Sequence, residues 1–210
     1  MAGGQGRRMG GLMKALLPIG EQSMIEHVSR QMSRLCSSVT VVVASEEQGK
    51  LLSGLNYPYL IDETPGRGPL AALHTALAYN CYSAVWVSAC DMPFVSDKAA
   101  ALLLREMEES GSMAAVPCLE GQLHPLQAIY RAECVEQVER CLQEGDYRMK
   151  GLLNKLNVVR VTEDKFHAAG INLSFIENIN TPEQYEAALQ VAEEEWGVAV
   201  GGSRLSNHGL

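Results

Sequence analysis

A glycine-rich segment at the start of the chain constrains the fold more than any other feature. Residues 2–11 contain five glycines and two arginines, and Lys14 follows shortly after them. Because glycine has no Cβ atom, such a loop can bend through positive φ and point successive N–H groups at an anion, while the basic side chains add charge. The alternative is a frayed N-terminus. The chain turns apolar directly after Lys14 and enters a helical pattern at Ser23, which favours an ordered phosphate site.

Two common phosphate-binding motifs do not fit this loop. A dinucleotide fingerprint that started at Gly4 would need a glycine where Met9 stands. A P-loop that started at Gly6 would need a lysine directly after Gly11, and Leu12 stands there. The loop therefore belongs to another class of nucleotide-binding sequence.

Composition bounds the class of protein. The chain has 210 residues, of which 47% are hydrophobic and 20% are charged, as expected for one globular domain. It contains no apolar run of the ~18 residues that a membrane span needs, and no basic-then-apolar signal sequence, so we expect a cytoplasmic protein without a membrane partner. A net charge of −8 argues against a nucleic-acid surface, although a small anion can bind where positive charge is local. The six cysteines form no Cys-x-x-Cys pair, which favours reduced thiols over disulfides or zinc.

Strand and helix patterns alternate along the chain, which predicts an α/β fold. Apolar or β-branched runs predict strands, and repeats of three or four residues predict helices. The predicted strands are 39–44, 57–61, 84–89, 113–117, 126–130 and 158–161, with a further segment at 175–180, and the predicted helices are 23–35, 69–79, 96–107, 132–144 and 182–196. Thr181 to Gln184 forms a capping box with proline at the first helical position. We expect one domain over 1–196 and a loosely ordered tail over 197–210.

Two aspartates follow predicted strands. Asp62 ends the 57–61 strand, and Asp91 follows the 84–89 strand. Ligands of parallel α/β sheets bind beyond the carboxyl ends of the strands. An aspartate in this place is often only a turn residue. Next to a phosphate loop, however, a carboxylate can hold the Mg²⁺ that nucleotide chemistry requires. The sequence thus predicts Asp91 as a metal ligand.

Five motifs carry a resemblance to a known family, the nucleotidyltransferases of the molybdenum cofactor guanylyltransferase type. The first is the glycine loop, whose matching residues are Ala2, Gly3, Gly4, Arg8, Met9, Gly10 and Lys14. The others follow in the family's order and are Asp62 with Gly68-Pro69-Leu70-Ala71, Cys90-Asp91-Met92-Pro93, His124-Pro125, and Asn178-Ile179-Asn180-Thr181-Pro182. Together they span residues 1–182.

The resemblance implies a Rossmann-like nucleotidyltransferase fold with a mainly parallel three-layer α/β/α sheet. It also implies transfer of GMP from GTP to molybdopterin, with Mg²⁺ as cofactor and with molybdenum cofactor biosynthesis proteins and acceptor molybdoenzymes as partners. The family places an apolar strand before the glycine loop, whereas this sequence starts at Met1. We therefore expect the first strand to be missing, either because the true start lies upstream or because the sheet lacks a central member.

The resemblance also assigns roles to residues. Arg8, Lys14 and Asp91 would be catalytic, with Asp91 on the metal. The nucleotide would contact Met1, Ala2, Gly3, Gly4, Lys14, Asp62 and Asp91. His124, Asn178 and Asn180 would face the molybdopterin side, although the two asparagines fit a polar turn equally well and the histidine can be structural.

Two readings compete with this one. A cytidylyltransferase of molybdopterin or of an isoprenoid precursor shares the outline of the glycine loop. The other is a non-catalytic nucleotide-binding or regulatory module that is degenerate because it lacks the first strand. Ala44 also stands where some relatives have a nucleotide-contacting asparagine, for which Ser45 is an imperfect substitute, and this departure weakens the expectation of full activity. An enzyme is favoured by the retention of Arg8, Lys14, Asp62 and Asp91, because a protein that only binds nucleotide has no need of the metal carboxylate.

Overall fold

The computed structural model of the chain describes residues 1–2, 14–52, 54 and 57–196. Its larger sheet has the strand order β5-β8-β6-β7, and β9 pairs with β6 off this path. The strands of this sheet are β5 (Ala84–Ser88), β6 (Ala114–Leu119), β7 (Gln122–Leu123), β8 (Gln127–Arg131) and β9 (Val158–Thr162). A separate pair is formed by β3 (Val41–Val43) and β4 (Tyr59–Ile61), which run parallel.

Strand directions are mixed. β6 and β9 run parallel, but β8 runs antiparallel to both β5 and β6, and β7 pairs antiparallel with β6. The α/β class is confirmed, and among the strands of the described residues the expected parallel pairing holds for β3–β4 and β6–β9 only. β8 reverses because β7 and β8 follow β6 through short turns, and short connections join antiparallel strands.

Met1 and Ala2 lie between β3 and β5. The Ala2 N–H donates to the Val42 carbonyl at 2.8 Å, the Met1 amine donates to the Ser88 carbonyl at 2.9 Å, and the Cys90 N–H donates to the Met1 carbonyl at 3.0 Å. Within the described residues, no assigned strand fills the space between β3 and β5. The first two residues therefore link the small strand pair to the larger sheet.

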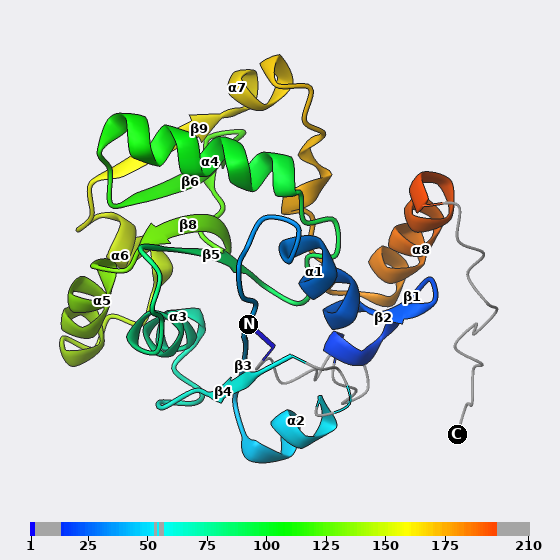
Figure 1. Cartoon of the computed structure of the whole chain (residues 1–210), viewed down its shortest axis with the longest axis horizontal. Helices are drawn as coiled ribbons and strands as arrows, with labels where there is room; N and C mark the ends of the chain where they lie inside the picture. Colours follow the sequence, from blue (N-terminus) through cyan, green and yellow to red (C-terminus); the bar gives the residue numbers. More distant parts are fainter. Residues whose placement is uncertain (3–13, 53, 55–56, 197–210) are drawn as a thin grey trace.

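Helices cover both faces of the larger sheet (Figure 1), which gives the expected three layers. One face packs against α1 (Met24–Met32), α4 (Asp97–Ser110) and α7 (Glu163–Ala168), with Trp86, Ile129 and Val161 contributed by the strands. The other face packs against α3 (Pro69–Ala78), α5 (Cys134–Gln143) and α6 (Met149–Leu153), with Val87, Val116 and Tyr130 from the strands. Successive strand residues point to opposite faces, so adjacent positions such as Trp86 and Val87 enter different cores.

Helix starts follow the predicted capping chemistry. Ser23 caps α1 in a reciprocal box with Glu26, and Ser96 caps α4 by accepting the Ala99 N–H. In front of α8 (Pro182–Trp196), the Thr181 hydroxyl accepts the Gln184 N–H while the Gln184 side chain accepts the Thr181 N–H. Each box satisfies backbone donors that the first turn leaves free, which fixes where the helix begins.

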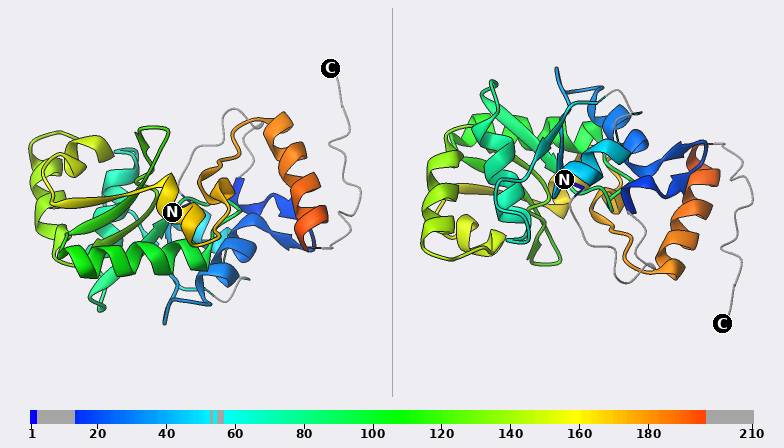
Figure 2. Two further views of the ribbon diagram at one scale, coloured as in Figure 1. Left: turned by 90° about the horizontal axis from the view of Figure 1, so that it is seen from above. Right: turned by 90° about the horizontal axis from the view of Figure 1, so that it is seen from below.

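The last helix packs away from the larger sheet. α8 lies beside the hairpin of β1 (Pro18–Ile19) and β2 (Gln22–Ser23), as both views of Figure 2 show. Its buried residues meet Leu17, Ile19 and Phe94 in a small core. The segment 175–180 leads to this helix as the end of a 3-10 turn, η4 (Leu173–Ile176), followed by an extended loop. This arrangement places the loop before α8 against the turn after β5, where the Ile179 N–H donates to the Asp91 carbonyl at 2.7 Å.

All six cysteines are free in the structure. No helix among the described residues is long and apolar enough to cross a membrane.

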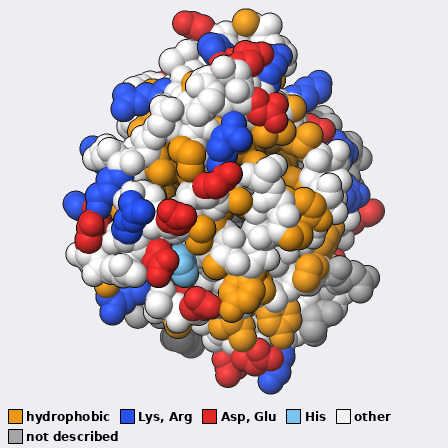
Figure 3. All heavy atoms as spheres, turned by 60° about the vertical axis from the view of Figure 1, so that its left-hand side comes forward, with side chains coloured by type: hydrophobic (Ala, Val, Ile, Leu, Met, Phe, Trp, Pro, Cys, Tyr) orange, Lys and Arg blue, Asp and Glu red, His pale blue; other side chains and the backbone are white. Residues whose placement is uncertain are grey.

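Several large side chains remain exposed, including Leu51, Ile61 and Tyr79. Hydrophobic side chains gather in the lower part of the face shown in Figure 3, with acidic groups beside them.

Candidate active site

A cavity of about 930 Å³ opens where β3, β4 and β5 end. Its walls come from the residues that follow these strands, from Met1 and Ala2, and from the start of α3. Lys14, Asp62 and Asp91 all line it. The volume lies in the range of pockets that enclose small ligands. The structure thus brings both strand-end aspartates and the lysine after the glycine loop to one site.

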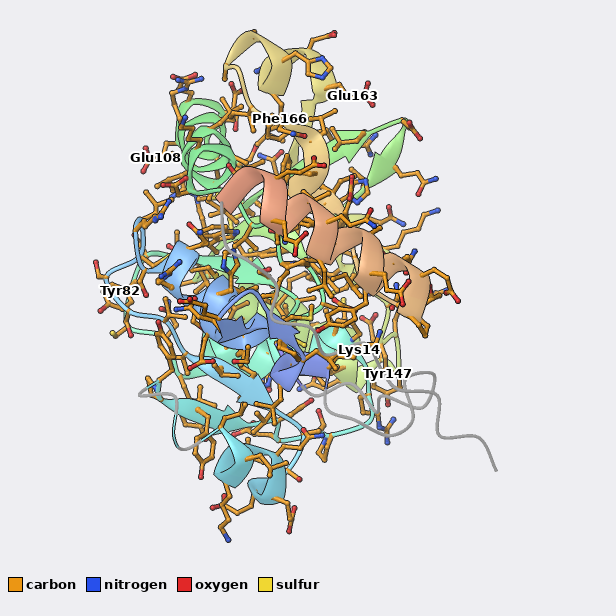
Figure 4. The ribbon with its side chains drawn as sticks, turned by 90° about the vertical axis from the view of Figure 1, so that its right-hand side faces the viewer. Lys14, Tyr82, Glu108, Tyr147, Glu163 and Phe166 are labelled. Carbon is orange, nitrogen blue, oxygen red and sulfur yellow. The ribbon has the colours of Figure 1, made fainter. Side chains whose placement is uncertain are left out.

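Lys14 begins the short 3-10 turn η2 (Lys14–Leu16) directly after the undescribed glycine segment. Its Nζ donates to the Ile179 carbonyl at 3.0 Å and to Asn180 Oδ1 at 2.9 Å. Both acceptors lie in the loop before α8, and Figure 4 shows Lys14 close to that helix. An ammonium group has three donors, so two hold it in place and the third makes no hydrogen bond to any described residue.

Asp91 lies in the turn that follows β5. Its carbonyl accepts the Ile179 N–H at 2.7 Å, which joins this turn to the loop that holds Lys14. Burial raises the pKa of the carboxyl, and the positive charge of Lys14 opposes that rise. The carboxylate therefore lies in a confined place where a cation would stabilise its charged form.

Asp62 stands at the end of β4 and is 8% exposed. Its N–H donates to the Val43 carbonyl at 2.7 Å, and its Oδ1 accepts the Thr64 N–H at 3.0 Å. Burial is the main cause that raises the pKa of this carboxyl. A partly desolvated acceptor at the cavity wall is suited to hydrogen-bond a sugar hydroxyl or a base N–H.

The wall next to Asp62 is a loop with two glycines of positive φ. Gly66 has φ +85° and Gly68 has φ +79°, which side chains rarely adopt. Both glycines line the cavity, and Pro69 starts α3 directly after them. The N-terminus of α3 therefore faces the site with its partial positive charge.

Met1, Ala2 and Cys90 form the floor of the cavity. Burial lowers the pKa of the Met1 amine, while the neighbouring Cys90 and Asp91 oppose this shift. Burial also raises the pKa of the Cys90 thiol to about 11. A free thiol with so high a pKa stays protonated near neutral pH.

The remaining predicted site residues fall into three groups. Gly3, Gly4 and Arg8 lie outside the described residues. His124 precedes the cavity residue Leu126 by two positions and does not itself line the cavity. Asn178 lines a different, smaller cavity of about 300 Å³ together with Phe94 and α8.

Asn180 and Ser45 are placed more specifically. Asn180 holds Lys14 through its side-chain oxygen, and its N–H donates to Gln184 Oε1 at 2.7 Å. Ser45 lines the cavity and accepts the Gln48 N–H at 3.3 Å as the cap of α2 (Glu46–Leu51). Sequence reasoning missed Gln48, which also lines the cavity and accepts the Ala44 N–H at 2.9 Å. Its position at the start of a helix after a strand end was the only available signal.

The donor set can accept Mg²⁺ under one condition. Among the described residues, no group of three or more histidine, cysteine, aspartate or glutamate side chains could hold a metal by itself. Mg²⁺ commonly binds through one or two carboxylates while substrate phosphates and water complete the octahedron. Asp91, confined at the cavity wall, fits that arrangement only when a nucleotide supplies the other oxygens.

Comparison with known proteins assigns the family. The sequence profile of the MobA-like NTP transferase domain matches residues 1–164. The chain belongs to this family. A relative from Desulfosudis oleivorans, named molybdenum cofactor guanylyltransferase, is 31% identical to this chain. The match covers 90% of this chain and 91% of the relative.

Solved structures agree with this assignment. The molybdopterin-guanine dinucleotide biosynthesis protein A from Archaeoglobus fulgidus superposes with a TM-score of 0.80 and 29% identity, over 92% of this chain and 96% of its own. The 2-C-methyl-D-erythritol 4-phosphate cytidylyltransferase from Thermus thermophilus superposes with a TM-score of 0.64 at 20% identity, over 86% of this chain and 94% of its own. The second likeness concerns the fold alone, and both confirm the Rossmann-like nucleotidyltransferase fold.

Proposed function

We propose that the protein transfers GMP from GTP to the terminal phosphate of molybdopterin and releases pyrophosphate. The observation that carries this proposal is the single cavity that collects Lys14, Asp62 and Asp91 in a member of the MobA-like family. The D. oleivorans relative and the A. fulgidus protein bear names of the same activity. The product would be the guanine dinucleotide form of the cofactor.

The reaction is a displacement at the α-phosphorus of GTP. An oxygen of the molybdopterin phosphate forms a bond to that phosphorus, while the bond to the oxygen bridging the α- and β-phosphates breaks. The electron pair leaves with pyrophosphate. Such transfers require alignment and charge stabilisation more than covalent help from the protein.

This chain's residues meet those two needs. Asp62 and the backbone at Met1, Ala2, Gly3 and Gly4 would hold the nucleoside end. Arg8 and the third donor of Lys14 would stabilise the charge that builds on the departing pyrophosphate. Asp91 would hold Mg²⁺, which when bound neutralises phosphate charge. His124 and Asn178 remain proposals for the acceptor side.

Partners and location follow from the substrates. Molybdenum cofactor biosynthesis proteins would supply the molybdopterin. Acceptor molybdoenzymes would receive the product. A reaction that consumes GTP agrees with a cytoplasmic location.

The test is a turnover assay with the full chain. Molybdopterin is offered with GTP, CTP or ATP, with and without Mg²⁺, and both pyrophosphate and the dinucleotide product are measured. We expect product with GTP and Mg²⁺. Faster turnover with CTP would assign the chain to cytidylyl transfer, and nucleotide binding without product under any condition would support a non-catalytic module.

A further inference from the structure

Gln127 is a buried polar side chain that the proposed mechanism does not use. It is the first residue of β8, is 1% exposed, and pairs in register with Ser88 on β5. Its Nε2 donates to Ser88 Oγ at 3.0 Å and lies 3.4 Å from Met92 Sδ. These two partners stand on either side of Asp91, three residues before it and one after it. A single amide group therefore contacts both flanks of the turn that carries the proposed metal ligand.

Burial makes these contacts obligatory. A buried amide without partners costs free energy, so its two N–H donors must find acceptors. The partners of Nε2 are Ser88, the last residue of β5, and Met92 of the Asp91 turn, and none of the described buried side-chain nitrogen and oxygen atoms lacks a partner. Gln127 thus keeps its contact with Met92 only while the turn holds its present conformation.

Three backbone hydrogen bonds between described residues also hold the turn. The Cys90 N–H donates to the Met1 carbonyl at 3.0 Å, the Met92 N–H donates to the Ala89 carbonyl at 3.2 Å, and the Asp91 carbonyl accepts the Ile179 N–H at 2.7 Å. Ser88 Oγ donates onward to the Ala89 carbonyl at 3.2 Å. Gln127 therefore braces the turn from the β8 side, and Ile179 braces it from the loop before α8.

We propose that Gln127 is a positioning residue that fixes the Asp91 turn so that the carboxylate meets the metal and the nucleotide phosphates. This inference rests on the proposed function. A group that reacts or binds metal must be held within about 0.5 Å of its productive position by its supporting contacts. Gln127 supplies such a contact without touching the substrate.

The test measures metal-dependent nucleotide binding rather than turnover alone. A non-hydrolysable GTP analogue is titrated at increasing Mg²⁺ concentration into wild type and Gln127→Met, which keeps the side-chain length but removes the N–H donors. We expect the Mg²⁺ concentration at half-saturation to rise about tenfold or more, as for other losses of outer hydrogen-bond partners. Binding of the analogue without metal should stay unchanged. Gln143→Met, at an exposed position on α5, is the matched control.

Two further variants separate positioning from general damage. In the Asp91→Asn background, Gln127→Met should cause no additional change in Mg²⁺ dependence. Ser88→Ala should raise the Mg²⁺ concentration at half-saturation in part, and Ser88→Thr should restore the wild-type value. These two variants test the positioning role if Gln127→Met does not fold. An equal shift with and without Asp91, or no shift in either Gln127→Met or Ser88→Ala, would overturn the positioning role. If Mg²⁺ does not tighten binding of the analogue to wild type, the metal role in the proposed function is overturned, and this inference with it.

Discussion

Lys14 Nζ lies 2.9 Å from Asn180 Oδ1, a hydrogen bond between residues 166 positions apart. The asparagine thus orients the cation that follows the glycine loop. The same loop accepts a second bond from Lys14 at Ile179 and donates one to Asp91. One segment before α8 therefore holds both the Lys14 ammonium group and the backbone of Asp91.

Replacement of Asn180 tests this relationship. In Asn180→Ala, Lys14 loses one acceptor, and a hydrogen bond to a charged group contributes about 1.5–3 kcal/mol. We expect kcat/KM for GTP to fall about tenfold or more, measured by steady-state kinetics. Asn154→Ala, at an exposed position after α6, is the control. A changed KM for molybdopterin with unchanged GTP use would instead place Asn180 on the acceptor side.

Removal of the Lys14 ammonium should weaken GTP use without changing the preferred base. Lys14→Ala deletes the charged donor that we propose to bind the triphosphate, so kcat/KM for GTP should fall about ten- to hundredfold. The ratio of GTP to CTP turnover should stay as in wild type. Lys98→Ala, an exposed lysine on α4, serves as control. A shift in that ratio would show that the lysine contacts the base.

Asp91→Asn should separate activity from stability. Turnover at saturating Mg²⁺ should fall about a hundredfold or more, because a charge at the transferring phosphate is no longer neutralised. Burial raises the pKa of this carboxyl, so its ionised form is disfavoured in the folded state, and thermal denaturation should give a melting temperature no lower than that of wild type. Asp164→Asn, at an exposed position on α7, should change neither quantity. Wild-type rates in Asp91→Asn would remove Asp91 from the metal site.

Stability should fall on mild acidification because of His27. This histidine of α1 is 4% exposed, and burial, together with Arg30 and Arg34, lowers its pKa from 6.5 to about 4. Between pH 6.5 and pH 4, His27 is therefore protonated in the unfolded chain but neutral in the folded chain. The free energy of unfolding decreases as pH falls from 6.5 toward 4. One pKa unit corresponds to about 1.4 kcal/mol, so we expect a loss of about 1–3 kcal/mol in urea denaturation. His27→Gln should flatten this dependence; an unchanged slope would assign it to other groups.

Local chemistry made much of the structure predictable. The caps at Ser23, Ser96 and Thr181 follow from side chains that satisfy the first turn of a helix, and Val41 to Val43 are buried as their pattern predicted. Asp62 and Asp91 share a cavity, as strand-end positions predicted. Each of these features depends on a few neighbouring residues, which the sequence displays directly.

Non-local features were not predictable in the same way. The direction of β8 depends on its partners, and an apolar run such as Ala128 to Tyr130 reads the same in either direction. The bond from Asn180 to Lys14 and the contact of Gln127 with Ser88 join distant segments, so spacing gave no signal for them. The assignment of Asn178 to a second cavity likewise required the packing of α8.

The bond between Lys14 and Ile179 also bears on synthesis. Lys14 leaves the ribosome early, whereas Ile179 follows 165 residues later. A chain grows at roughly 5–20 residues per second, so many seconds pass between the synthesis of Lys14 and that of its acceptors. The sheet and most helices can form during that interval, but the ammonium group of Lys14 cannot be held in place until the segment with Ile179 and Asn180 has been made. A chain that is terminated before Ile179 would therefore lack both of these acceptors.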